Sequence, residues 1–259
     1  MPDSLPAVGG EIALGSALFT LVEPHRGHEV AYNRWYERDH FYAGCLIGPW
    51  LFAGRRWVAT QDLKALRFGT EPGVFGGIGL GSYLAVYWIL AHHHREHVDW
   101  ASRQVRWLHE NGRMFAERDH VHTLLYRHAW TASAKPEGVP AELALDHPFG
   151  GLTATLVELA DGVTASDLGE WVRSAYPPEL EMGFTPIPLP ADAPVTQRGL
   201  DRLERRVMNL SFTHDSPSKW WDEQHRAADQ LAADGVGQVL WTAPFIPTIP
   251  GTDTYTDQL

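Results

Sequence analysis

Three side chains in the first quarter of the sequence have the types needed for proton transfer and charge stabilisation. Tyr36 and His40 are four residues apart in a segment with helical spacing, so we expect them on one helical face. An imidazole exchanges protons near neutral pH, and a guanidinium such as that of Arg56 can balance a carboxylate or an enolate. The pattern predicts His40 as the acid and base, Arg56 as the anion stabiliser and Tyr36 as a hydrogen-bonding partner.

Each of these residues also has a purely structural interpretation. His40 could be a core histidine bonded to a carbonyl group, because perturbed titratable groups are often structural. Arg56 could form an ion pair with Glu23 or Glu37, since arginine is usually exposed. Both interpretations stay open at the level of the sequence.

The aromatic content suggests a site for a flat organic ligand. The 259 residues include 11 Trp, 8 Tyr and 10 Phe, and such rings either fill a core or line a concave site. Most of them are expected in the core. A substrate-binding wall is predicted from Trp35, Trp57, Tyr87 and Trp88.

Two further motifs resemble ligand sites but lack the context that such sites need. The run His92–His94 continues into Arg95, Glu96 and His97, yet there is no HExxH pattern and no evident third ligand. A solvated corner between a strand and a helix explains the run, so we predict no metal site and no cofactor. The glycines between 76 and 81 precede a strand instead of opening a helix, and they therefore predict no phosphate site.

Periodicity predicts two rounds of the order strand, helix, strand, strand, helix, strand, with one strand of the second round weak or missing. The glycine-rich residues 61–81 are expected to form a mobile loop and a candidate lid. Residues 177–194 contain too much proline for regular structure. The expected strands cover 17–22, 50–60, 83–91, 123–132, 152–159, 207–213 and 238–245, and the expected helices cover 28–43, 95–118, 166–175 and 219–233.

These elements predict an α+β protein with two ferredoxin-like halves, whose antiparallel sheets meet face to face in one chain. The expected divisions are an arm (1–15), a first half (16–134), a linker (135–150), a second half (151–248) and a tail (249–259). A hollow between the sheets would receive Tyr36, His40 and Arg56. The barrel needs no second subunit, although a homodimer stays open.

Charge and cysteine content restrict the partners and the compartment. The formal net charge of −11 offers no cationic surface for nucleic acid or an anionic membrane. A single cysteine, Cys45, cannot form an internal disulfide, and the first residues lack a basic segment followed by an apolar one. The longest apolar run, 82–91, is too short to span a bilayer. These features predict a cytoplasmic protein with a small-molecule partner.

Two segments carry a resemblance to a known family. The sequence Trp35-Tyr36-Glu37-Arg38-Asp39-His40, and then residues 48–57 with Pro49, Arg56 and Trp57, resemble the EthD-like branch of the dimeric α+β barrel superfamily. That pattern has a Trp-Tyr pair and a histidine on the first helix, then a turn and an Arg-aromatic pair on the second strand. This chain differs in being a fused pair and in having Trp50 where a turn glycine is common. The resemblance therefore implies one site, in the first half.

The resemblance implies a cofactor-independent protein of secondary metabolism or catabolism that handles a hydrophobic aromatic or carbonyl compound. Isomerisation, cyclisation and dehydration suit acid–base groups of this kind. Two alternatives stay open: a non-catalytic binding protein for the same ligand class, and a heme-binding enzyme of the same superfamily that would use one of the histidines, such as those in the run 92–94.

Overall fold

The computed structural model describes residues 12–135, 137–176, 178–188 and 200–259 of the chain. Eight strands in these ranges close into one barrel, and every pair of neighbouring strands is antiparallel. The strands are β1 (Leu14–Pro24), β2 (Leu51–Val58), β3 (Tyr83–Leu90), β4 (Arg118–Ala132), β5 (Gly151–Leu159), β6 (Leu180–Ile187), β7 (Arg206–Thr213) and β8 (Gly237–Pro247).

The barrel consists of two halves with the same strand order. Its sequence of neighbours, β1-β3-β2-β8-β5-β7-β6-β4, contains β4-β1-β3-β2 from the first half and β8-β5-β7-β6 from the second. The halves join where β2 pairs with β8 and where β4 pairs with β6. The predicted fold class, two ferredoxin-like halves forming an α+β barrel within one chain, is therefore confirmed.

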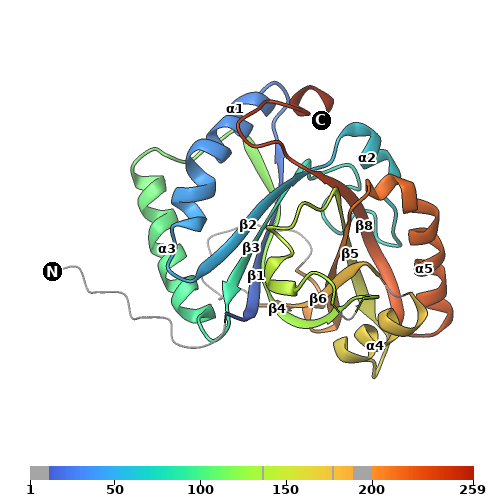
Figure 1. Cartoon of the computed structure of the whole chain (residues 1–259). Helices are drawn as coiled ribbons and strands as arrows, with labels where there is room; N and C mark the ends of the chain where they lie inside the picture. The colour runs from blue at the N-terminus through green and yellow to red at the C-terminus, as the bar shows by residue number, and fades with distance from the viewer. Residues whose placement is uncertain (1–11, 136, 177, 189–199) are drawn as a thin grey trace.

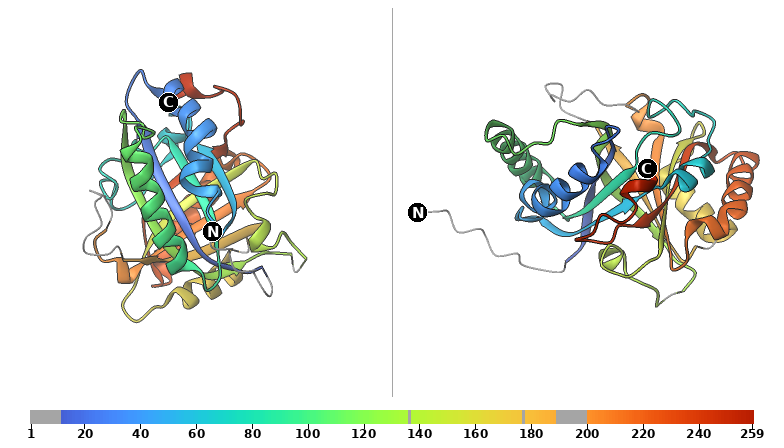
Figure 2. Two further views of the ribbon diagram at one scale, coloured as in Figure 1. Left: turned by 90° about the vertical axis from the view of Figure 1, so that its left-hand side faces the viewer. Right: turned by 90° about the horizontal axis from the view of Figure 1, so that it is seen from above.

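Helices cover the outer face of each half. The first half carries α1 (Glu29–Trp35), a π-helix that continues it over Tyr36–Leu46, α2 (Gln61–Leu66) and α3 (His94–Glu110). The second half carries α4 (Ala165–Ala175) and α5 (Trp221–Ala233). Figures 1 and 2 show α1 and α3 on one side of the barrel and α4 and α5 on the other. Each sheet thus has one face toward the barrel interior and one toward its own helices.

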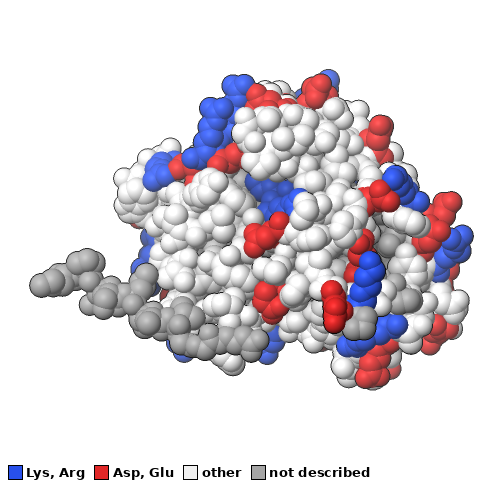
Figure 3. Space-filling view, viewed as in Figure 1, with Lys and Arg blue, Asp and Glu red and all other residues white. Residues whose placement is uncertain are grey.

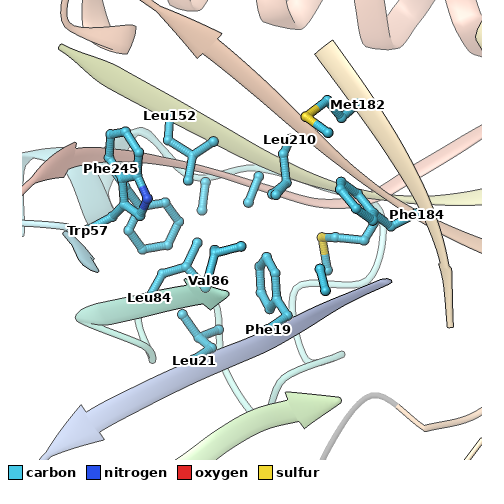
Figure 4. Close-up of a cluster of buried hydrophobic side chains, with 14 of the residues drawn as sticks. Phe19, Leu21, Trp57, Leu84, Val86, Leu152, Met182, Phe184, Leu210 and Phe245 are labelled. Atoms are coloured by element: carbon cyan, nitrogen blue, oxygen red, sulfur yellow. The ribbon is translucent and has the colours of Figure 1, made fainter. Parts of the chain in front are cut away.

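The interior of the barrel is occupied by the main hydrophobic cluster instead of the hollow that the sequence predicted. Phe19 and Val86 of the first half face Leu210 and Phe184 of the second, as Figure 4 shows. All four side chains are at most 2% exposed. The barrel interior therefore holds packed side chains where the sequence predicted a space for a ligand.

Three element predictions were wrong. Residues 177–194, expected to be irregular, contain β6, whose Met182 is fully buried in the barrel. The second helix of the first half ends at Glu110 instead of 118, because Gly112 takes a positive φ of 65° and β4 begins at Arg118. The expected loop 61–81 begins with α2, for which Thr60 is the N-cap.

The glycine-rich segment is anchored by two side chains, in contrast to the predicted lid. The Arg67 guanidinium donates to the carbonyl oxygens of Ile78, Leu80 and Gly81 at 2.7–3.0 Å. Phe75 is 1% exposed and belongs to the barrel cluster. These contacts hold the segment against the barrel.

Figure 3 shows the charged side chains on one face of the molecule. Basic side chains form several separate groups there, with acidic side chains near most of them. None of the described helices is both long and apolar enough to cross a membrane.

Candidate functional site

The predicted site residues lie on both faces of the first half's sheet. Arg56 and Tyr87 point toward the helices, whereas their neighbours Trp57 and Trp88 belong to the barrel cluster. Successive residues of a strand alternate between faces, so neither neighbouring pair can share a pocket. The prediction of one hollow for all of them is wrong, and the layer next to the helices holds Trp35, Tyr36, His40, Arg56 and Tyr87.

This first layer is filled by aromatic rings. The Tyr36 and Tyr87 hydroxyl groups are 2.8 Å apart and buried, and burial raises the pKa of both well above the ordinary range. The His40 ring stacks on Trp35 with 4.6 Å between ring centres. Burial, together with the charge of Arg118, lowers the pKa of His40 to about 4, and His40 is neutral at pH 7.

Arg56 is enclosed by its own partners. Its Nη1 donates to Asn33 Oδ1 at 2.9 Å and to Glu37 Oε1 at 3.0 Å. The guanidinium lies 4.6 Å from the Tyr36 ring centre and 4.8 Å from that of Tyr83. The ion-pair alternative with Glu37 is thus realised, although the pair is buried instead of exposed.

The corresponding layer of the second half contains a pocket. It lies between the sheet and helices α4 and α5, with Leu168 and Leu231 of those helices among its apolar walls. The cavity has a volume of about 50 Å³ and is open to solvent at its mouth. A few water molecules fit inside, or the reactive end of a ligand whose body extends through the mouth.

Polar side chains meet at the floor of the pocket because the strand register aligns them. Asn209 of β7 pairs with Thr155 of β5, which in turn pairs with Thr242 of β8. Two residues after Asn209 on β7, Ser211 pairs with Glu181 of β6. All five side chains point toward the helices and line the pocket.

Glu181 is the group with the clearest potential for chemistry. Its Oε1 accepts a hydrogen bond from Asn209 Nδ2 at 2.9 Å, and the Ser211 hydroxyl also donates to it. Burial raises the pKa of Glu181 from 4.5 to about 7, although these two bonds act in the opposite direction. The carboxyl group therefore exists in both protonation states near neutral pH.

One wall of the pocket comes from the first half. Phe68, which follows α2, bonds to the backbone of Thr242 in β8. The chain can approach β8 this closely because residue 69 is glycine: a Cβ there would lie 2.1 Å from Leu240 O. The α4 side is fixed by Trp171, whose Nε1 donates to Asp234 Oδ2 at 2.7 Å. The pocket is therefore assembled from both halves of the chain.

Sequence reasoning missed this pocket because it assigned the site to the first half and no strand to residues 177–194. Leu180, Met182 and Phe184 alternate with Glu181 and Gly183, which is the pattern of a strand with one apolar face. An acidic residue on such a strand was the signal that could have indicated the site.

The histidines were one candidate for holding a heme or a metal ion. None of them is among the described residues that line this pocket. In the run 92–94, the His93 ring stacks on Trp50 at 3.7 Å and His94 Nδ1 lies 3.0 Å from Ser16 Oγ. Among the described residues, no group of three or more His, Cys, Asp or Glu side chains is arranged to hold a metal ion. The described lining therefore offers no axial histidine for a heme, and the nearby His225 of α5 stacks on Phe68 at the pocket wall with 3.8 Å between ring centres.

Comparisons with known proteins relate this chain to solved structures. No protein-family model and no curated protein match the sequence. A proposed monooxygenase from Fusobacterium nucleatum is similar over 92% of this chain and 94% of its own, with 9% identity and a TM-score of 0.47. The encapsulated DyP-type peroxidase of Mycobacterium smegmatis is similar over 96% of both chains, with 11% identity and a TM-score of 0.47.

A third similar structure is DypB of Rhodococcus jostii, determined in complex with heme. It covers 91% of this chain and 94% of its own, with 11% identity and a TM-score of 0.44. Because these identities and TM-scores are low, the fold is assigned from the strand pairing within this chain, and the chemistry is inferred from its own side chains.

Proposed function

We propose that this protein is an acid–base enzyme for a small hydrophobic molecule, with Glu181 as the group that transfers the proton. The observation that carries this proposal is a buried carboxyl group, with a pKa of about 7, that lines a pocket. General acid–base catalysis works best when the pKa lies near the working pH, and it contributes about 10²- to 10⁴-fold to a rate.

The arrangement suits a reaction that moves a proton within one substrate. The Glu181 carboxylate would take a proton from a carbon atom next to a carbonyl group and return it to another atom. Isomerisation, cyclisation and dehydration of a carbonyl or phenolic compound have this form, and none of them consumes an external oxidant. Asn209 Nδ2 would hold the carboxylate in position during the transfer.

The experiment follows exchange of acidic carbon-bound protons in deuterated water by NMR, with a panel of small neutral ketones. We expect the wild-type protein to accelerate exchange for at least one ketone, and Glu181→Gln to lose about 10²-fold or more of that acceleration. Glu170→Gln, on the exposed side of α4, is the matched control. Equal exchange by the wild type and Glu181→Gln contradicts the proposal. A ketone that binds without exchange indicates the alternative, a binding protein.

A second candidate is proton transfer by His40 in an EthD-like first half. Its support is that His40 is neutral at pH 7 and that its buried Nδ1 has no hydrogen-bond partner among the described residues. The motif residues Tyr36 and Arg56 lie around it on the first helical segment and the second strand. In this proposal Arg56 acts through its charge on the Tyr36 ring, because its Nη1 is already bound.

The same exchange assay separates the two candidates. If His40 transfers the proton, His40→Ala loses the acceleration while Glu181→Gln keeps it. If instead Glu181→Gln loses the acceleration and His40→Ala keeps it, the reaction belongs to the second-half pocket and the His40 candidate is rejected. Circular dichroism verifies that both variants are folded.

A further inference from the structure

Asn209 provides an unused hydrogen-bond acceptor inside the second-half pocket. The residue is 5% exposed, and its Nδ2 is directed to Glu181 Oε1. Its Oδ1 is buried and has no partner among the residues that the structure describes. A buried acceptor without a partner lowers stability, so a ligand that donates a hydrogen bond to it would recover that free energy.

The charges around the pocket restrict the ligand further. Among the described residues, the lining contains no Lys, Arg or His, so a carboxylate or phosphate ligand would face Glu181 without a compensating cation from them. A carboxylate also has no proton to give to Asn209 Oδ1. A cationic amine could donate to Asn209 but would have to leave water for a mostly apolar space.

Glu181 adds the complementary requirement. In its protonated form the carboxyl group donates one O–H bond, and a ligand carbonyl oxygen is a suitable acceptor. Asn209 and Glu181 lie on adjacent strands, β7 and β6, and are bonded to each other. A ligand therefore meets one acceptor and one donor side by side.

From this pairing we infer that the substrate is a neutral, flat molecule that carries an N–H or O–H donor next to a carbonyl acceptor, as in a lactam, an enolised diketone or a hydroxy-ketone. The donor binds Asn209 Oδ1, and the carbonyl oxygen accepts a hydrogen bond from the protonated form of Glu181, one of the two forms present near neutral pH. The apolar body lies against Phe68, Val157 and Leu168. This inference deepens the proposed function and rests on the same pocket.

Four probes of similar size test the inference: 2-pyridone (donor and acceptor), N-methyl-2-pyridone (acceptor only), benzoate (anion) and benzylamine (cation). Binding is measured by ligand-observed NMR and by calorimetry with the full chain. We expect 2-pyridone to bind at least about tenfold more tightly than the other three, as one buried hydrogen bond allows. Asn209→Leu should remove the difference between the two pyridones, and Glu181→Gln should keep it, because an amide N–H can replace the carboxyl O–H.

Equal binding of the two pyridones to the wild type, tighter binding of benzoate or benzylamine, or no binding of any probe at millimolar concentration would each overturn the inference. If Asn209→Leu fails to fold, the binding of the four probes to the wild type still tests the inference. Failure here is distinguishable from failure of the proposed function, because the proton-exchange assay measures chemistry at Glu181 for ketones without a donor.

Discussion

Replacing Glu181 by glutamine should change how stability depends on pH. The pKa of Glu181 rises from 4.5 in the unfolded chain to about 7 in the folded protein because of burial. Between these values the folded state binds one proton more than the unfolded state, so the free energy of unfolding falls as the pH increases. Below pH 4.5 both states are protonated, and above about pH 7 the loss is complete.

The size of this loss follows from the two pKa values. At 1.36 kcal/mol for each pH unit, the rise from 4.5 to about 7 corresponds to about 3 kcal/mol. Glutamine has nearly the same shape and keeps an acceptor for Asn209 Nδ2, but it cannot ionise. We therefore expect Glu181→Gln to gain about 3 kcal/mol relative to the wild type between pH 4.5 and pH 8.

Urea unfolding at half-unit steps from pH 4.5 to 8.5, for the wild type and Glu181→Gln, measures this difference. Glu170→Gln on the exposed face of α4 is the control, and we expect it to stay within about 0.5 kcal/mol of the wild type throughout. A constant difference between Glu181→Gln and the wild type would mean that the carboxyl group titrates as in water. That result would remove the basis for assigning proton transfer to this residue.

Three more substitutions test the packing of the first layer, the second layer and the barrel interior, in that order. Arg56→Met leaves Glu37, whose side chain is 12% exposed, without its cation, and should cost about 3–5 kcal/mol in urea unfolding. The double variant Arg56→Met/Glu37→Gln should recover part of that loss, and no recovery would contradict the buried ion pair. Gly183→Ala places a Cβ 2.1 Å from Trp130 Cε2 and should cost about 1–3 kcal/mol, whereas an unchanged urea midpoint would show that the indole can move. Met182→Ala, in the barrel interior, should cost about 2–5 kcal/mol by thermal unfolding, and a loss below about 1 kcal/mol would mean that β6 contributes little to the core.

The elements that sequence reasoning found are those with a continuous or regular apolar pattern. β3 is the clearest case, because every residue of Tyr83–Leu90 is buried and the run is apolar on both faces. β6 was missed because prolines surround it and its helix-facing positions hold Glu181 and Gly183. Those two residues occur there because one lines the pocket and the other leaves room for Trp130.

The site prediction failed where residue type was considered without the faces of the strand. Arg56 and Trp57 are adjacent, so the period of two places them on opposite faces of β2, and sequence alone was sufficient to separate them. The contents of each layer could not be predicted in the same way. The Tyr36 and Tyr87 side chains can either fill the layer between sheet and helices or line a cavity in it. Which of these occurs depends on the distance between the helices and the sheet, and no local sequence pattern specifies that distance.

Fusion of the two halves allows the two layers to differ in their contents. In a barrel made of two identical chains, a substitution that fills one layer with aromatic rings also fills the other. Here the first layer packs Tyr36, Tyr87 and Arg56 tightly, while the second keeps Glu181 and Asn209 facing a space. The buried carboxyl group and the unpaired amide oxygen both reduce stability, and the hydrophobic clusters of the first layer and of the barrel can offset that cost. A closed barrel within one chain thus allows one half to serve as the support and the other to hold the reactive groups.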